Sequence, residues 1–146
     1  MNEPIYFLSK TDQYSEFSNF HHAPIKIDDK IWKTTEAYFQ AQKFLHDPAY
    51  QETIRNAQTP TMAKKLGSTR KVKIRDDWEQ IKDDVMSRAL YAKFMQHQTL
   101  KQLLLSTGNR PLVENNKRDN YWGIGNGNGL NKLGKALCDL RERLNK

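Results

Sequence analysis

The stretch DNYWGIGNGNGLNKLGKA, at residues 119–136, joins a dense glycine loop to a helical pattern. From Gly129 it has the spacing of a phosphate-binding P-loop, but Ala136 stands where the motif needs a hydroxyl for Mg²⁺. The dinucleotide-binding pattern also fails, because its third glycine would fall on Leu130. Leucines at 130, 133, 137, 140 and 144 predict a helix that begins inside the loop. The sequence therefore favours a glycine loop that leads into a helix N-terminus, where backbone N–H groups can receive an anion.

Length and composition indicate one globular domain over residues 1–146. Hydrophobic residues make up 37% of the chain, which is typical of a folded protein and too low for a membrane protein. The apolar run at residues 5–8 is too short for a signal peptide or a membrane span, so we expect a cytoplasmic protein without membrane contact. The single Cys138 excludes an internal disulfide and a cysteine-based zinc site.

The net charge of +7 points to an anionic partner. The basic residues are densest in one run, whose members are Lys64, Lys65, Arg70, Lys71, Lys73 and Arg75. A solvated face is an equally good interpretation of such a run. A nucleic-acid-binding module is less favoured, because the run contains no aromatic residue that could stack on a base.

The pattern of apolar residues predicts more helices than strands. Short strands are expected at 5–8 and 23–27, and the second leads through KIW at 30–32 to the capping residues Thr34 and Thr35. The segment at 111–114 is expected to return to the sheet. Helices are expected at 36–45, 48–57, 60–66, 76–96 and 97–106. Strands and helices do not alternate regularly, so the expected class is a helix-rich α+β domain with a small β-sheet.

Two acidic residues have both an ordinary and a functional interpretation. Glu36 lies in the first turn of its helix, with Gln40 and Lys43 on the same face, and an acidic residue there commonly complements the helix dipole. The opposite face is expected to be an apolar stripe of Ala37, Ala41, Phe44 and Leu45. Asp119 precedes the glycine loop, where aspartate usually forms a turn.

Two tryptophans are also ambiguous. Trp78 falls on the apolar stripe of the 76–96 helix, which favours a place in the core, whereas Trp122 precedes the glycine loop.

Six segments, taken in order, resemble the YbiA-like proteins of the NADAR (NAD and ADP-ribose) superfamily. They are FSNF at 17–20, IWKTTEAYFQAQKF at 31–44, RDDWEQIKDDVM at 75–86, YAKFMQH at 91–97, LLLSTGNRPLVE at 103–114 and DNYWGIGNGNGLNKLGKAL at 119–137. Each motif is short, but the ordered set is specific and spans most of the chain. The sequence departs from the family at Ala37, where His is common, and at residues 114–117, where ENNK replaces an acidic stretch followed by Ser-Pro.

This resemblance implies an N-glycosidase of riboflavin-biosynthesis intermediates, which cleaves the C–N bond between ribose 5-phosphate and an amino-pyrimidine. It implies neither a metal nor another cofactor. The family's functional positions fall on Glu36, Trp78, Asp119 and Trp122. We expect these four residues to line one pocket.

The residue types suit that reaction. Cleavage builds positive charge on the ribose, which a carboxylate such as Glu36 stabilises, while Asp119 is the better candidate for the proton donor; the two roles could be exchanged. The indoles of Trp78 and Trp122 can stack on the base. Gly123 and Gly125 are expected to let the backbone come close to the ligand. Arg70, Lys71 and Arg75 are weaker candidates for binding the 5′-phosphate.

Other activities remain open. The same chemistry would serve an ADP-ribose or NAD glycohydrolase, which needs a longer groove for its larger substrate. In either case the partner is a phosphorylated small molecule, and nucleic acid enters only as an ADP-ribosylated substrate. The sequence leaves the physiological glycoside and the oligomeric state open.

Overall fold

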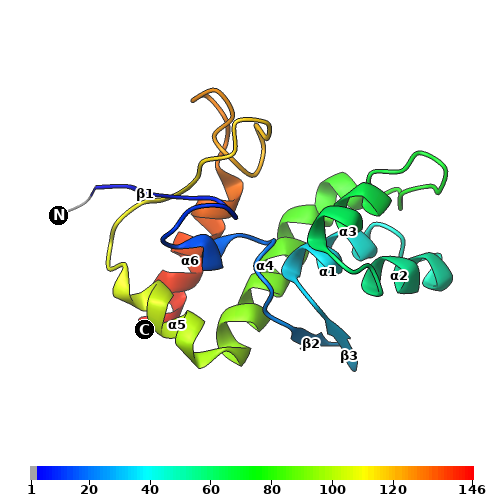
Figure 1. Cartoon of the computed structure of the whole chain (residues 1–146), viewed down its shortest axis with the longest axis horizontal. Helices are drawn as coiled ribbons and strands as arrows, with labels where there is room; N and C mark the ends of the chain where they lie inside the picture. Colours follow the sequence, from blue (N-terminus) through cyan, green and yellow to red (C-terminus); the bar gives the residue numbers. More distant parts are fainter. Residues whose placement is uncertain (1–2) are drawn as a thin grey trace. The chain divides into compact units, whose positions relative to one another are not determined.

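The computed structural model describes residues 3–146, and the chain divides into two compact units (Figure 1). The central unit is the continuous segment His22–Gln96. The terminal unit combines Met1–His21 with His97–Lys146, so that both ends of the chain contribute to it.

The central unit begins with a β-hairpin. Strand β2 (Ile25–Ile27) pairs with β3 (Lys30–Trp32) in antiparallel fashion, with Ile25 opposite Trp32. Asp28 and Asp29 connect the strands with φ angles of 54° and 65°. Positive φ at both central residues is characteristic of the two-residue turns that match the twist of a hairpin.

Four helices follow the hairpin: α1 (Thr35–Gln42), α2 (Pro48–Arg55), α3 (Pro60–Gly67) and α4 (Trp78–Gln96). The first three are capped by side chains that local sequence supplies. The side-chain oxygens of Thr34, Asp47 and Thr59 each accept the backbone N–H three residues further along. Pro48 and Pro60 occupy first-turn positions, where a missing N–H has no cost.

Helix α1 lies at the centre of this unit, in contact with α2, α3 and α4 (Figure 1). Its buried residues join those of the hairpin and the other helices in one hydrophobic cluster. The large members of that cluster are Ile25, Ile27, Trp32, Tyr38, Phe44 and Ile54. Burial of this apolar surface is the main favourable term that holds the four helices together.

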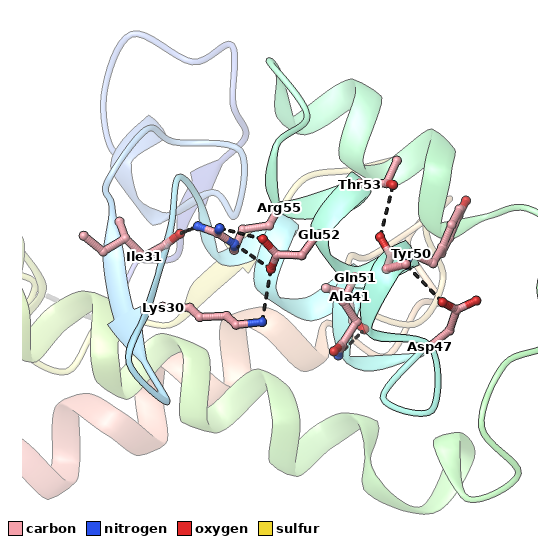
Figure 2. Close-up of polar contacts among 10 residues, drawn as sticks. Lys30, Ile31, Ala41, Asp47, Tyr50, Gln51, Glu52, Thr53 and Arg55 are labelled. Atoms are coloured by element: carbon pink, nitrogen blue, oxygen red, sulfur yellow. Dashed lines mark hydrogen bonds and ion pairs between the residues drawn. The ribbon is translucent and has the colours of Figure 1, made fainter.

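Hydrogen bonds and an ion pair join α2 to β3 and α1, as Figure 2 shows. Glu52 accepts hydrogen bonds from Arg55 at 2.6 Å and from Lys30 of β3 at 3.1 Å. The bond from Arg55, followed by that from Lys30, lowers the pKa of Glu52 to about 2. Gln51 donates its Nε2 to the carbonyl oxygen of Ala41 at 3.0 Å, which joins α2 to α1.

The terminal unit contains a parallel strand pair and two helices. Strand β1 (Ile5–Phe7) pairs with β4 (Leu112–Glu114), and a short 3₁₀ turn, η1, covers Ser15–Phe17. Helix α5 (Gln98–Ser106) precedes β4, and α6 (Lys132–Leu144) packs against both α5 and β4. A Cβ at Gly134 would collide with the carbonyl oxygen of Leu112, so glycine permits α6 to approach β4 closely.

The helix-rich α+β class is confirmed, and each predicted helix forms within a few residues of its expected bounds. The strands form two separate pairs, one in each unit. Two expectations about leucines are wrong. Leu130 is 48% exposed and precedes α6, and Leu45 is 54% exposed beyond the end of α1, so neither belongs to an apolar stripe. In residues 3–146 no helix has both the length and the apolar character of a membrane span.

Candidate active site

Glu36 is buried at the positive end of α1. Thr34 caps this helix and Glu36 follows two residues later, with only 7% of its surface exposed. Its Oε2 accepts a hydrogen bond of 2.6 Å from Nε2 of Gln40, one turn further along. Burial of an acidic side chain is costly unless it is hydrogen-bonded, so this environment differs from that of an exposed helix-end glutamate.

Gln40 and Lys43 connect the Glu36 face of α1 to the end of α3. Lys43 donates its Nζ to the carbonyl oxygen of Gly67 at 3.2 Å, and burial lowers the pKa of Lys43 against the opposing effect of Glu36. The amide of Gln40 lies directly against Gly67, where a Cβ would collide with it. Within residues 3–146, Oε1 of Gln40 is buried without a hydrogen-bond partner, which typically costs about 1–3 kcal/mol.

Trp78 is the first residue of α4 and only 6% of its surface is exposed. Its ring centroid lies 5.0 Å from that of Phe39 on α1, with the planes inclined at 60°. This contact matches the core interpretation of Trp78 and places the indole beside the helix that carries Glu36.

Asp119 forms the turn that precedes the glycine loop. Its Oδ1 accepts the backbone N–H groups of Tyr121 at 2.9 Å and Trp122 at 2.8 Å. These two bonds are the contacts expected of a turn-forming aspartate. They orient the carboxylate through its Oδ1.

The glycine loop closes on the N-terminus of α6. Four backbone N–H groups, those of Leu130, Asn131, Lys132 and Leu133, donate to loop carbonyls between residues 120 and 123 at 2.8–3.1 Å. These four N–H groups are therefore already paired within the chain, and anion binding at this helix start stays a prediction.

Gly125 has a structural reason to be glycine. Its φ is +54°, and a Cβ would collide with the side chain of Asn120. Gly123 is also buried, and its carbonyl oxygen accepts the N–H of Asn131. Close approach of a ligand to Gly123 and Gly125 stays a prediction.

Trp122 is only partly buried, unlike Trp78. Its ring meets that of Tyr121 edge to face, with centroids 4.9 Å apart, and Nζ of Lys132 lies 5.6 Å from the Tyr121 ring. A partly exposed, braced indole is a suitable surface for stacking on a flat base.

The three basic residues expected near a phosphate have different environments. Arg75 donates two hydrogen bonds to the carboxylate of Asp77, at 2.7 and 3.1 Å, and one to the carbonyl oxygen of Gln42 at 3.4 Å. Arg70 and Lys71 are exposed in the segment between α3 and α4. Arg70 and Lys71 therefore suit an exposed phosphate better than Arg75, which would have to leave Asp77.

The four residues proposed for catalysis and base binding belong to both units. Glu36 and Trp78 lie in the central unit, and Asp119 and Trp122 lie in the terminal unit. That all four line one pocket stays a prediction. Residues 3–146 contain no group of three or more His, Cys, Asp or Glu side chains placed to hold a metal ion.

Lys93 is a buried charged residue outside the set of candidates expected from the sequence. It is fully buried in α4, with Nζ 5.3 Å from the ring centroid of Phe94. The helical periodicity of α4 could have predicted the burial of Lys93, since Met86, Ala89 and Leu90, at seven, four and three residues before it, are buried.

Comparisons with known proteins agree on one family. A model of the NADAR domain matches residues 6–145. N-glycosidase YbiA of Escherichia coli (strain K12) is 50% identical over 141 residues, which cover 96% of this chain and 88% of that protein. The NMR structure of E. coli YbiA superposes with a TM-score of 0.91 at 48% identity, covering 99% of this chain and 87% of that one.

Two further relatives extend the comparison. An N-glycosidase of Nostoc punctiforme is 42% identical over 143 residues, covering 96% of this chain and 92% of that protein. A riboflavin biosynthesis protein of Vibrio vulnificus is 35% identical over 145 residues, which cover 99% of this chain but only 39% of that longer protein.

Proposed function

The chain belongs to the NADAR domain family, and from this premise we propose that it cleaves the C–N bond between ribose 5-phosphate and an amino-pyrimidine. It is a hydrolase acting on N-glycosyl bonds, the class named for its relatives in E. coli and N. punctiforme. A substrate from riboflavin biosynthesis is supported by the name of the more distant V. vulnificus relative. A non-catalytic nucleic-acid-binding module does not fit a chain with these enzyme relatives.

The observation that carries this proposal is the buried, oriented carboxylate of Glu36. Hydrolysis of an N-glycoside develops positive charge on the ribose as the C–N bond lengthens. A carboxylate held in a low-dielectric environment stabilises such charge far more than one in water, because nearby solvent does not screen it. The fixed hydrogen bond from Gln40 keeps the Glu36 carboxylate from rotating freely.

Asp119 is the second carboxylate of the proposed mechanism. With Oδ1 bound to the N–H groups of the turn, its Oδ2 is the atom that would handle the proton of the leaving base or of water. Trp122 would hold the pyrimidine by stacking, and its backbone N–H donates to the carboxylate of Asp119. Arg70 and Lys71 would attract the 5′-phosphate.

A direct assay tests the substrate. The purified protein is incubated separately with phosphoribosylamino-pyrimidines, with NAD and with ADP-ribose, and the product of each is measured by chromatography: ribose 5-phosphate, ADP-ribose and adenine, respectively. We expect ribose 5-phosphate from the pyrimidine glycosides, and a Glu36→Gln variant serves as the control for contaminating enzymes. Turnover of NAD or ADP-ribose alone would contradict the proposed substrate and favour the glycohydrolase alternative.

A further inference from the structure

Gln40 lies between the proposed catalytic carboxylate and the end of α3. Its Nε2 bonds to Glu36, while its Oε1 faces Gly67. We propose that Gln40 is a positioning residue, whose Nε2 donates a hydrogen bond to the Glu36 carboxylate and so fixes its orientation. Gly67, which has no side chain, leaves the space that the Gln40 amide needs. The inference rests on the proposed catalytic role of Glu36.

The orientation of the Gln40 amide follows from its neighbours. If the amide were rotated by half a turn, its oxygen would lie about where Nε2 now lies, 2.6 Å from Oε2 of Glu36, and two acceptors would face each other unless Glu36 carried a proton. The observed orientation leaves Oε1 buried without a partner. In this orientation the amide oxygen of Gln40 lacks a hydrogen-bond partner, while its Nε2 donates to Glu36. A donor at this position favours the ionised form of the Glu36 carboxylate.

Gly67 determines whether this orientation fits. A Cβ at residue 67 would collide with the Oε1, Cδ and Cβ atoms of Gln40, so any larger residue would displace the whole side chain. The carbonyl oxygen of the same glycine accepts Nζ of Lys43. The end of α3 therefore contacts both polar residues that follow Glu36 on its helix face.

Lys43, the residue after α1, interacts electrostatically with Glu36 and with charged groups of two other helices. Lys64 comes from α3, and Glu79 and Lys82 come from α4. Substitutions at residue 40 leave all four in place. An effect confined to residue 40 variants therefore reports the contact with Glu36 rather than the wider charge distribution.

Two substitutions of Gln40 test the proposal. Gln40→Met keeps the length of the side chain but removes the donor, so kcat should fall at least about tenfold, the equivalent of one hydrogen bond, while KM changes less than about twofold. Gln40→Glu places a second carboxyl against Glu36, and the pair should share a proton. In the pH–rate profile of Gln40→Glu, the acid limb should move to higher pH by at least about one unit.

Gln51 provides the matched control. It is a second buried glutamine of the central unit, and its Nε2 donates to the carbonyl oxygen of Ala41 instead of a carboxylate. Gln51→Met and Gln51→Glu should lower the melting temperature as the Gln40 variants do. Neither should change the pH–rate profile, because neither alters a contact of Glu36.

A second measurement is independent of turnover. The ¹³Cδ resonance of Glu36, assigned with Glu36→Gln, is followed through a pH titration in each variant. The midpoint should move upward in Gln40→Met and further in Gln40→Glu, and stay unchanged in the Gln51 variants. Where Gln40→Met is too unstable to measure, the isosteric Gln40→Glu variant decides.

The two readouts separate this inference from the proposed function. A moved Glu36 titration in a protein that hydrolyses none of the glycosides contradicts the substrate proposal and supports the contact. An active protein whose titration and pH–rate profile are the same in Gln40→Glu as in the wild type overturns the positioning role alone.

Discussion

The molecule carries two pairs of an acidic residue and a tryptophan, and the two are held differently. In the helix pair, Glu36 and Trp78 are both buried and contact side chains, those of Gln40 and Phe39. In the loop pair, Asp119 and Trp122 are only partly buried, and the carboxylate bonds to backbone N–H groups.

The two pairs should therefore respond differently to substitution: the helix pair in the stability of the protein, and the loop pair in the local geometry of the loop. The helix pair is embedded in packed helices, so a substitution there leaves a cavity or removes the partner of a buried polar group. The loop pair depends on a turn that its own backbone completes, so a substitution there should act mainly on the loop and on a ligand that stacks against it. Four substitutions, one at each residue, test this contrast.

Trp78→Ala should have the largest effect. Removal of a buried indole should lower the free energy of unfolding by about 3–5 kcal/mol, because it leaves a cavity beside Phe39. Urea denaturation followed by circular dichroism measures this, with Trp78→Phe as the control that keeps an aromatic ring. A Trp78→Ala protein of normal stability that has lost substrate binding would instead make Trp78 a stacking platform.

Glu36→Gln should come next, with an effect on chemistry rather than folding. The new amide oxygen can still accept the hydrogen bond from Gln40, so the protein should fold and bind the glycoside. Turnover should fall at least about a hundredfold, since the charge that stabilises the ribosyl cation is lost. Release of ribose 5-phosphate at saturating substrate gives kcat; a folded variant within a few-fold of wild type would remove Glu36 from the mechanism.

Asp119 allows its turn role and its chemical role to be distinguished. Asp119→Ala removes the acceptor of two backbone N–H groups and should cost about 1–3 kcal/mol of unfolding free energy. Asp119→Asn keeps an oxygen at that position, so it should cost less than about 1 kcal/mol and still lower turnover. Thermal unfolding and the glycosidase assay are run on both variants; normal turnover in Asp119→Asn would limit Asp119 to forming the turn.

Trp122→Ala should have the smallest effect. The indole is partly exposed, so its loss should raise KM about tenfold through lost stacking while the fold is kept. The variant is measured by steady-state kinetics and by substrate titration against tryptophan fluorescence. Unchanged binding would exclude Trp122 from holding the base.

Local sequence accounts for most of the helices. Thr34, Asp47 and Thr59 cap the helices that follow them through contacts only three residues away, and such contacts are visible in the sequence. The prediction of an α6 that begins in the loop was wrong by two residues, because Asn131 pairs its side chain with the backbone of β4 instead. The backbone N–H groups of residues 130–133 are bonded as well, and their acceptors lie in the loop at residues 120–123.

The sequence by itself determined the family, the helix-rich class and the place of Glu36 in the first turn of a helix beside Gln40. Those conclusions depend on spacing along the chain, which the printed residues contain. Only the tertiary structure decided that Glu36 is buried, that Gly67 faces the amide of Gln40, and that Lys43 reaches the same glycine. Gly67 lies 27 residues after Gln40, and no local pattern specifies a contact between two helices, because it is produced by the packing of the whole unit.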